Sequence, residues 1–119
     1  MHMIGLRRGD IVLVEIVDPQ LQNPKLRPVV VLTKSAKSEF VTELGVVGIT
    51  GTIPKVIPDD FVKLPYHANR HPRTGLTKKS AAVCGWLVTI NETGVQKRIG
   101  RVPEKQLREI VAIVNGLEE

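Results

Sequence analysis

Residues 8–33 read RGDIVLVEIVDPQLQNPKLRPVVVLT, and this segment predicts two strands joined by a loop. Residues 10–17 are rich in β-branched side chains and carry one charge in mid-run, Glu15, which is typical of a strand. Residues 28–33 form a continuous apolar run of strand length, which predicts a buried strand with Pro28 at its first position. Residues 18–28 hold three prolines and no periodicity, so a loop is predicted between the two strands.

The rest of the chain continues this pattern until its last segment. Further strands are predicted at residues 44–50, 61–64, 81–90 and 97–102. After Pro103, apolar residues recur at helical spacing and predict one helix that ends at Gly116; they are Leu107, Ile110, Val111 and Val114. Short sequential strands followed by one helix predict a mainly β fold, an antiparallel sheet or small barrel with a C-terminal α-helix.

The composition describes a single domain over residues 1–119. Of these residues 42% are hydrophobic and 24% charged, enough for a core without disulfides or metals. Only 3% are aromatic, which argues against a module built on rows of stacking rings. No apolar run approaches the roughly 20 residues of a bilayer span, and no secretory signal is visible. The single Cys84 lies in an apolar run, which predicts a buried, inert thiol in a reducing cytoplasm.

The net charge of +5 is concentrated in one part of the chain. Residues 65–101 carry seven basic and one acidic side chain, and within them residues 65–79 read PYHANRHPRTGLTKK, a long polar loop. A local positive field attracts polyanions. The segment therefore indicates a surface for nucleic acid, an acidic protein segment or an anionic surface, or else a solvated basic loop.

The side chains suited to chemistry are those that bind phosphate. His67 and His71 have no neighbouring cysteine or acid, so no metal site is predicted, and there is no Gly-rich phosphate loop or serine nucleophile elbow. Arginine, lysine, threonine and histidine on loops beside strands remain. Their donors suit phosphate oxygens and can stabilise charge that builds on phosphorus, so a phosphodiester ligand is predicted, with no cofactor.

Six short segments, in order, resemble the MazF/PemK toxins, the ribonuclease components of toxin–antitoxin pairs. The match begins with RGDIVLV, DP and LRPVVVL at residues 8–14, 18–19 and 26–32. It continues with VVGIT at residues 46–50, TGL at residues 74–76 with the strand through Cys84, and IGRV at residues 99–102 before the helix.

This resemblance implies a fold, an activity and partners. The fold is a small SH3-like antiparallel barrel with a C-terminal helix, and the partners are a second copy, a cognate acidic antitoxin and single-stranded RNA. The activity is metal-independent, sequence-specific cleavage of RNA in the cytoplasm. The 2′-hydroxyl attacks the adjacent phosphate and leaves a 2′,3′-cyclic phosphate and a 5′-hydroxyl, so DNA would be spared.

The family's loop arginine falls on Arg27 and its strand-end threonine on Thr50. The resemblance implies that Arg27 contacts the scissile phosphate and stabilises the dianionic transition state, and that Thr50 donates a hydrogen bond to the same phosphate. A guanidinium, with a pKa above about 12, is a poor general base. In a purely structural interpretation, Arg27 braces its loop and Thr50 closes a turn.

Two departures from the family pattern leave proton transfer unassigned. Gln22 stands where many members have an acid. Residues 83–86 read Val-Cys-Gly-Trp where the plasmid-borne branch reads Arg-Cys-Asp-Gln, so Gly85 replaces an aspartate. Because an imidazole titrates near neutral pH, His71 or His67 is a hypothetical substitute.

Seven residues are predicted to bind the substrate: Gln22, Lys25, Arg70, His71, Arg73, Lys78 and Lys79. Tyr66 is a candidate for base stacking, whereas Trp86 is interpreted as core or dimer interface. Two alternatives stay open because a fold does not fix a function. One is a CcdB-like toxin that targets gyrase, and the other is a non-catalytic domain that binds RNA or an acidic peptide.

Overall fold

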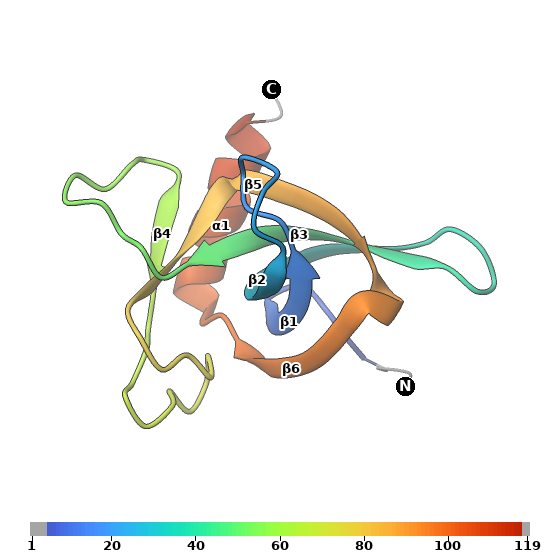
Figure 1. Cartoon of the computed structure of the whole chain (residues 1–119), viewed down its shortest axis with the longest axis horizontal. Coiled ribbons are helices and arrows are strands. Elements are labelled where there is room, and N and C mark those ends of the chain that lie inside the picture. Colours follow the sequence, from blue (N-terminus) through green and yellow to red (C-terminus); the bar gives the residue numbers. More distant parts are fainter. Residues whose placement is uncertain (1–4, 118–119) are drawn as a thin grey trace.

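Six strands and one α-helix make up most of the regular structure of the described residues, 5–117, in this computed structural model (Figure 1). The strands are β1 (Asp10–Ile16), β2 (Lys25–Ala36), β3 (Thr42–Thr50), β4 (Phe61–Leu64), β5 (Ser80–Asn91) and β6 (Val95–Arg101). A 3-10 turn (Glu92–Gly94) precedes β6, and the helix is α1 (Glu104–Leu117). The strands form one antiparallel sheet in the order β4-β5-β3-β2-β1-β6.

The predicted mainly β fold with a C-terminal helix is confirmed, with two corrections. Pro28 is not the first residue of its strand, because β2 begins at Lys25 and pairs with β1 there. The proline is tolerated because β3 pairs with β2 only from Val29 onward, so Pro28 has one neighbouring strand. Gly116 does not end the helix, since it does not take the left-handed conformation of a helix-ending glycine.

The core has two layers, one on each face of the sheet. The first contains the predicted helical stripe, with Leu107, Ile110 and Val114 buried against strand residues such as Ile11. In Figure 1 the helix lies behind the sheet, where it packs against β5 and β4. The second layer, on the other face, is built around Trp86. No helix in residues 5–117 has both the length and the apolar character needed to cross a membrane.

The segment that differs from the family pattern, residues 83–86, lies at a bulge in β5. The ladder between β3 and β5 moves from Val47–Leu87 directly to Gly48–Val83, so residues 84–86 have no partners on β3. The Trp86 ring folds over Gly48, where a Cβ atom would overlap it. Cys84 is fully buried, and burial, together with Asp60, raises the pKa of its thiol to about 11. The prediction of a buried thiol is confirmed.

The basic loop of residues 65–79 is ordered by its own backbone. The main-chain N–H groups of His67 and His71 both donate to the carbonyl of Leu76, at 3.1 and 3.0 Å. Thr74 is fully buried, and its hydroxyl donates to the carbonyl of Pro65 at 2.8 Å. The loop also docks on β6, because Gly100 lies directly beneath the backbone of Thr74. This docking holds the loop against β6.

Candidate functional site

A groove of about 420 Å³ lies where the start of β2, the end of β3 and the end of the basic loop meet. Four of the predicted site residues line it: Lys25, Arg27, Thr50 and Lys78. Arg27 and Thr50 are brought together by the sheet itself. The β2–β3 register pairs Val29 with Gly48, and its continuation sets Arg27 opposite Thr50.

The Arg27 side chain is held by three contacts. Its Nε donates to the carbonyl of Ile16 at 3.3 Å, and Nη2 donates to the carbonyl of Asn23 at 3.0 Å. Its guanidinium carbon lies over the Trp86 ring, 5.5 Å from the centroid, within the range of a cation–π interaction. The β5 bulge and Gly48 therefore supply the surface on which this arginine rests. The guanidinium is half-buried and already oriented.

The loop between β1 and β2 is closed around Asp18. Its carboxylate accepts hydrogen bonds from the main-chain N–H groups of Gln20 and Gln22, at 3.1 and 2.9 Å, and from the Asn23 amide at 3.0 Å. The bond from Gln22, followed by that from Asn23, holds the pKa of Asp18 below its ordinary value of 3.8. This loop supplies the carbonyl of Asn23 that holds Arg27. The order of the loop and the position of Arg27 are thus coupled.

The lowered pKa of Asp18 gives a pH dependence with a definite sign. A carboxylate with a depressed pKa contributes order above its unfolded value, and that contribution is lost as the pH falls through its folded pKa. We expect the amide resonances of Gln20 and Gln22 to titrate with an apparent pKa below 3.8 in an NMR experiment. Titration at or above 3.8 would contradict the Asp18 turn. In Asp18→Asn the same resonances should show no such step.

Thr50 and Lys78 meet at the other side of the groove. The Thr50 hydroxyl oxygen accepts from the main-chain N–H of Thr52 at 3.1 Å, and its own proton has only a 3.4 Å contact to the carbonyl of Thr52. Its donor is thus weakly engaged. The Lys78 side chain lies across Gly51, with Cε 2.9 Å from where a Cβ on that glycine would be. A side chain at residue 51 would displace the lysine from this position in the groove.

The groove is suited to an anion with several oxygens. Its lining holds three cationic side chains, four hydroxyl-bearing residues and no carboxylate. A second cavity of about 800 Å³, beneath the β1–β2 loop, is lined mainly by apolar side chains and by Asp18 and Asp60. Those carboxylates repel phosphate. The groove is therefore the better phosphate site.

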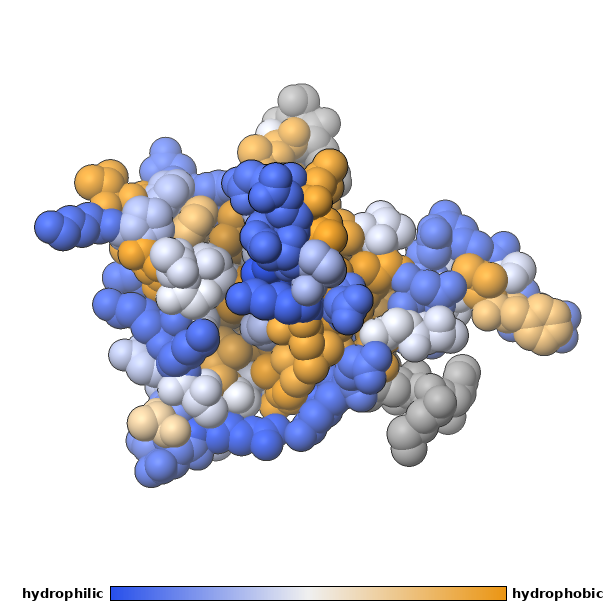
Figure 2. Space-filling view, viewed as in Figure 1, coloured by the Kyte–Doolittle hydropathy of each residue, from blue (hydrophilic) through white to orange (hydrophobic). Residues whose placement is uncertain are grey.

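Five predicted site residues do not line the groove: Gln22, Arg70, His71, Arg73 and Lys79. Gln22 is exposed on the Asp18 loop, and Arg73 and Lys79 are exposed at the basic loop. In Figure 2, hydrophilic side chains gather along the lower edge of the molecule, over this loop and β6. Arg70 donates instead to the carbonyl of Ile99, at 3.3 Å.

Both histidine rings accept hydrogen bonds from main-chain N–H groups of their own loop. Nδ1 of His71 accepts from the main-chain N–H groups of Arg73 and Thr74, at 3.1 and 3.2 Å. Nδ1 of His67 accepts from the N–H of Asn69 at 3.0 Å. Nδ1 of each ring is therefore already engaged as a hydrogen-bond acceptor within the loop. Tyr66 is half-exposed, and Trp86 is buried in the core, as its apolar context indicates.

Three hydroxyl residues of the groove are absent from the sequence-based prediction: Thr52, Thr77 and Ser80. Ser80 opens β5 just as Thr50 closes β3, so a hydroxyl at a strand end was the available signal. Across residues 5–117, no three His, Cys, Asp or Glu side chains come together as a metal-binding group.

Solved structures with the same fold extend these observations. A toxin of Mycobacterium tuberculosis, MazF-mt6, superposes with a TM-score of 0.62 at 21% identity, over 90% of this chain and 93% of that one. The MazE–MazF structure (Form-II) from Deinococcus radiodurans gives 0.68 at 15% identity, over 93% of each chain. An endoribonuclease in complex with its cognate antitoxin, from a mycobacterial species, gives 0.61 at 15% identity, over 95% of this chain and 97% of that one.

These likenesses show the fold, and the family is shown by sequence. A comparison with curated proteins found no match. A family model described as the PemK-like, MazF-like toxin of type II toxin–antitoxin systems matches residues 7–116, nearly the whole chain. The chain therefore belongs to the PemK-like, MazF-like family of toxins of type II toxin–antitoxin systems.

Proposed function

We propose that the protein is a metal-independent, sequence-specific endoribonuclease that cleaves single-stranded RNA. One observation carries the proposal: the groove gathers Lys25, Arg27, Thr50 and Lys78 with no carboxylate in its lining. Cationic forks and hydroxyl donors of this kind bind a phosphodiester and stabilise the charge of its transition state. The solved endoribonuclease of the same fold supports the activity by analogy.

In the proposed reaction the 2′-oxygen attacks the adjacent phosphorus. The bond from phosphorus to the 5′-oxygen breaks, and the proton of the 2′-hydroxyl ends on that 5′-oxygen. The products are a 2′,3′-cyclic phosphate and a 5′-hydroxyl, and no water is consumed. Arg27 stabilises the added negative charge of the transition state, and Thr50 donates to the same phosphate.

The proposed partners follow from charge and family. An acidic segment of a cognate antitoxin would occupy the cationic groove and exclude RNA. Related toxins have been crystallised as MazE–MazF and with a cognate antitoxin. We also propose a homodimer in the cytoplasm, and sedimentation at the monomer mass of 13.1 kDa would contradict the dimer.

Thr50 gives the first test of the activity. RNA with little secondary structure is incubated with the protein in a buffer that contains a metal chelator, and the new RNA ends are mapped. We expect discrete cuts with 5′-hydroxyl ends, and about thirtyfold slower cutting by Thr50→Ala, because one donor to a charged phosphate is lost. Thr50→Ser keeps the hydroxyl and should cut nearly as fast as the wild type.

Other outcomes would redirect the proposal. Equal cutting by wild type and Thr50→Ala would exclude a role for this hydroxyl. RNA binding without cutting would favour the non-catalytic binding domain. Neither binding nor cutting, together with inhibition of gyrase, would favour the CcdB-like toxin.

A further inference from the structure

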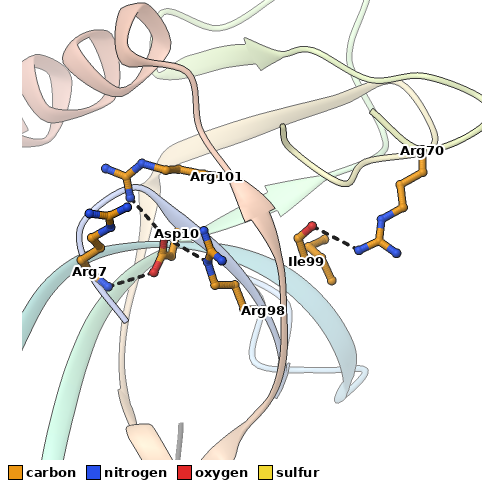
Figure 3. A network of polar contacts seen from close by, with 6 residues as sticks. All are labelled: Arg7, Asp10, Arg70, Arg98, Ile99 and Arg101. Carbon is orange, nitrogen blue, oxygen red and sulfur yellow. Dashed lines mark hydrogen bonds and ion pairs between the residues drawn. The ribbon is translucent and has the colours of Figure 1, made fainter. Parts of the chain in front are cut away.

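Three arginines form a row beside the groove, outside its lining. They are Arg70, Arg98 and Arg101, and we call them the arginine row. Figure 3 shows Ile99 between Arg70 on one side and Arg98 and Arg101 on the other. Ile99 itself lines the groove. The row is therefore continuous with the candidate site, although it shares no side chain with it.

A bulge in β6 turns two of these arginines to the same face. In an uninterrupted strand, residues three positions apart point to opposite faces. Here the ladder pairs Val12 with Arg98 and Ile11 with Gly100, so Ile99 has no partner on β1. This extra residue brings Arg98 and Arg101 to one carboxylate. The carbonyl of Ile99 accepts from Arg70 instead.

That carboxylate belongs to Asp10, which is 1% exposed. Its Oδ1 lies 3.1 Å from Nη1 of Arg101 and 3.2 Å from Nε of Arg98. Its Oδ2 accepts from the main-chain N–H of Arg7 at 2.9 Å. Asp10 thus orients two guanidinium planes while cancelling only one charge. With Arg70, three cations stand against one anion, and the row keeps a net charge of +2.

The row keeps donors for a ligand. The side chains of Arg98 and Arg101 are 46% and 28% exposed. Within residues 5–117, neither terminal nitrogen of Arg98 donates to an acceptor, and Nη2 of Arg101 does not either. Planar guanidinium forks with free donors match phosphate oxygens, and the ion pairs with Asp10 already orient both of them, which lowers the entropy cost of binding.

We propose that the arginine row binds backbone phosphates of an RNA that extends beyond the groove. The inference rests on the proposed function, because it assigns the row to the same substrate. A single RNA strand carries a phosphate at every nucleotide, so it contacts groove and row together. Groove and row adjoin at Ile99, so one RNA strand can pass from the groove to the row without leaving the surface.

Arg98→Ala tests the row. Asp10 keeps Arg101 and the Arg7 N–H, so the variant should fold and melt as the wild type does. We expect affinity for an RNA of about twenty nucleotides to fall about fivefold, and the slope of log K against log salt to shrink by about 0.7. An RNA of about five nucleotides, filling only the groove, should bind both proteins equally.

Arg108→Ala is the matched control. It removes the same guanidinium charge from an exposed position of α1 that lines neither the groove nor the row, where the side chain is 71% exposed and pairs with Glu104. We expect its affinity for the long RNA to change by less than about twofold. Arg98→Lys should keep the salt slope.

Each remaining outcome is decisive. Equal losses for Arg98→Ala and Arg108→Ala, or equal losses on short and long RNA, would overturn the row and leave the groove's function standing. Binding by the wild type without cleavage, with the Arg98 effect present, would keep the row and overturn the nuclease. If the wild type binds no RNA, both proposals fail. A polyglutamate that binds in an Arg98-dependent way would then assign the row to acidic protein.

Discussion

Arg27→Ala should slow RNA cleavage by about a thousandfold, the largest effect expected of any side chain in this protein. We expect this loss because the Arg27 guanidinium is already oriented by its contacts in the folded protein. Main-chain carbonyls of Ile16 and Asn23 and the Trp86 ring fix the guanidinium of Arg27, which lines the same groove as Thr50. A donor oriented in advance needs no reorganisation as charge builds on the phosphate. The measurement is the single-turnover cleavage rate on an RNA with one mapped cut site.

Arg27→Lys separates charge from geometry. It keeps the positive charge but loses the planar fork, so we expect it to recover only about tenfold of the lost rate. In both variants we expect the affinity for RNA to fall by a smaller factor than the cleavage rate, because the transition state carries more charge than the ground state. Cleavage by Arg27→Ala within about threefold of the wild type would place the chemistry elsewhere.

Gly100→Ala should destabilise the fold by about 3 kcal/mol and lower Tm by roughly 10 °C. The added Cβ would overlap the carbonyl carbon and oxygen of Thr74. Those are backbone atoms of a buried residue whose hydroxyl is bonded to Pro65, so they cannot swing aside as a flexible side chain can. Thermal unfolding followed by circular dichroism measures the effect.

The control for Gly100 lies in the helix. A Cβ at Gly116 meets no atom within 4 Å, and this glycine is helical. Gly116→Ala should therefore leave the stability unchanged or raise it by up to about 1 kcal/mol. If Gly100→Ala melts within about 2 °C of the wild type, the basic loop does not dock on β6 as described.

The strands were predictable wherever apolar side chains make the pattern. β1, β3, β4 and the central part of β2 follow from β-branched runs, and α1 follows from its apolar stripe. The extension of β2 to Ala36 was not predictable, because residues 34–36 are exposed and include no large apolar side chain. They are strand only because they pair with residues 42–44 across a hairpin. The sequence of one strand does not show which residues of another strand it will pair with.

The lining of the groove was predictable in part, for the same reason, and its role as the site stays a prediction. One groove is lined by four of the predicted residues, Lys25, Arg27, Thr50 and Lys78. The ring of His71 instead accepts a hydrogen bond within its own loop. The bulges at Trp86 and Ile99 depend on the register against another strand. Asp10 holds arginines that lie about ninety residues further along the chain. Local propensity carries no information about such a contact.

The β5 bulge also gives the protein a built-in optical label. Trp86 is the only tryptophan in the chain, and it is 8% exposed beneath the guanidinium of Arg27. Indole emission responds to a nearby charge and to water. When a phosphate or an acidic peptide pairs with the guanidinium that lies over the ring, the charge next to the indole changes, so we expect the intrinsic fluorescence to change without any added dye. The state of the groove can thus be followed in real time in the unmodified protein.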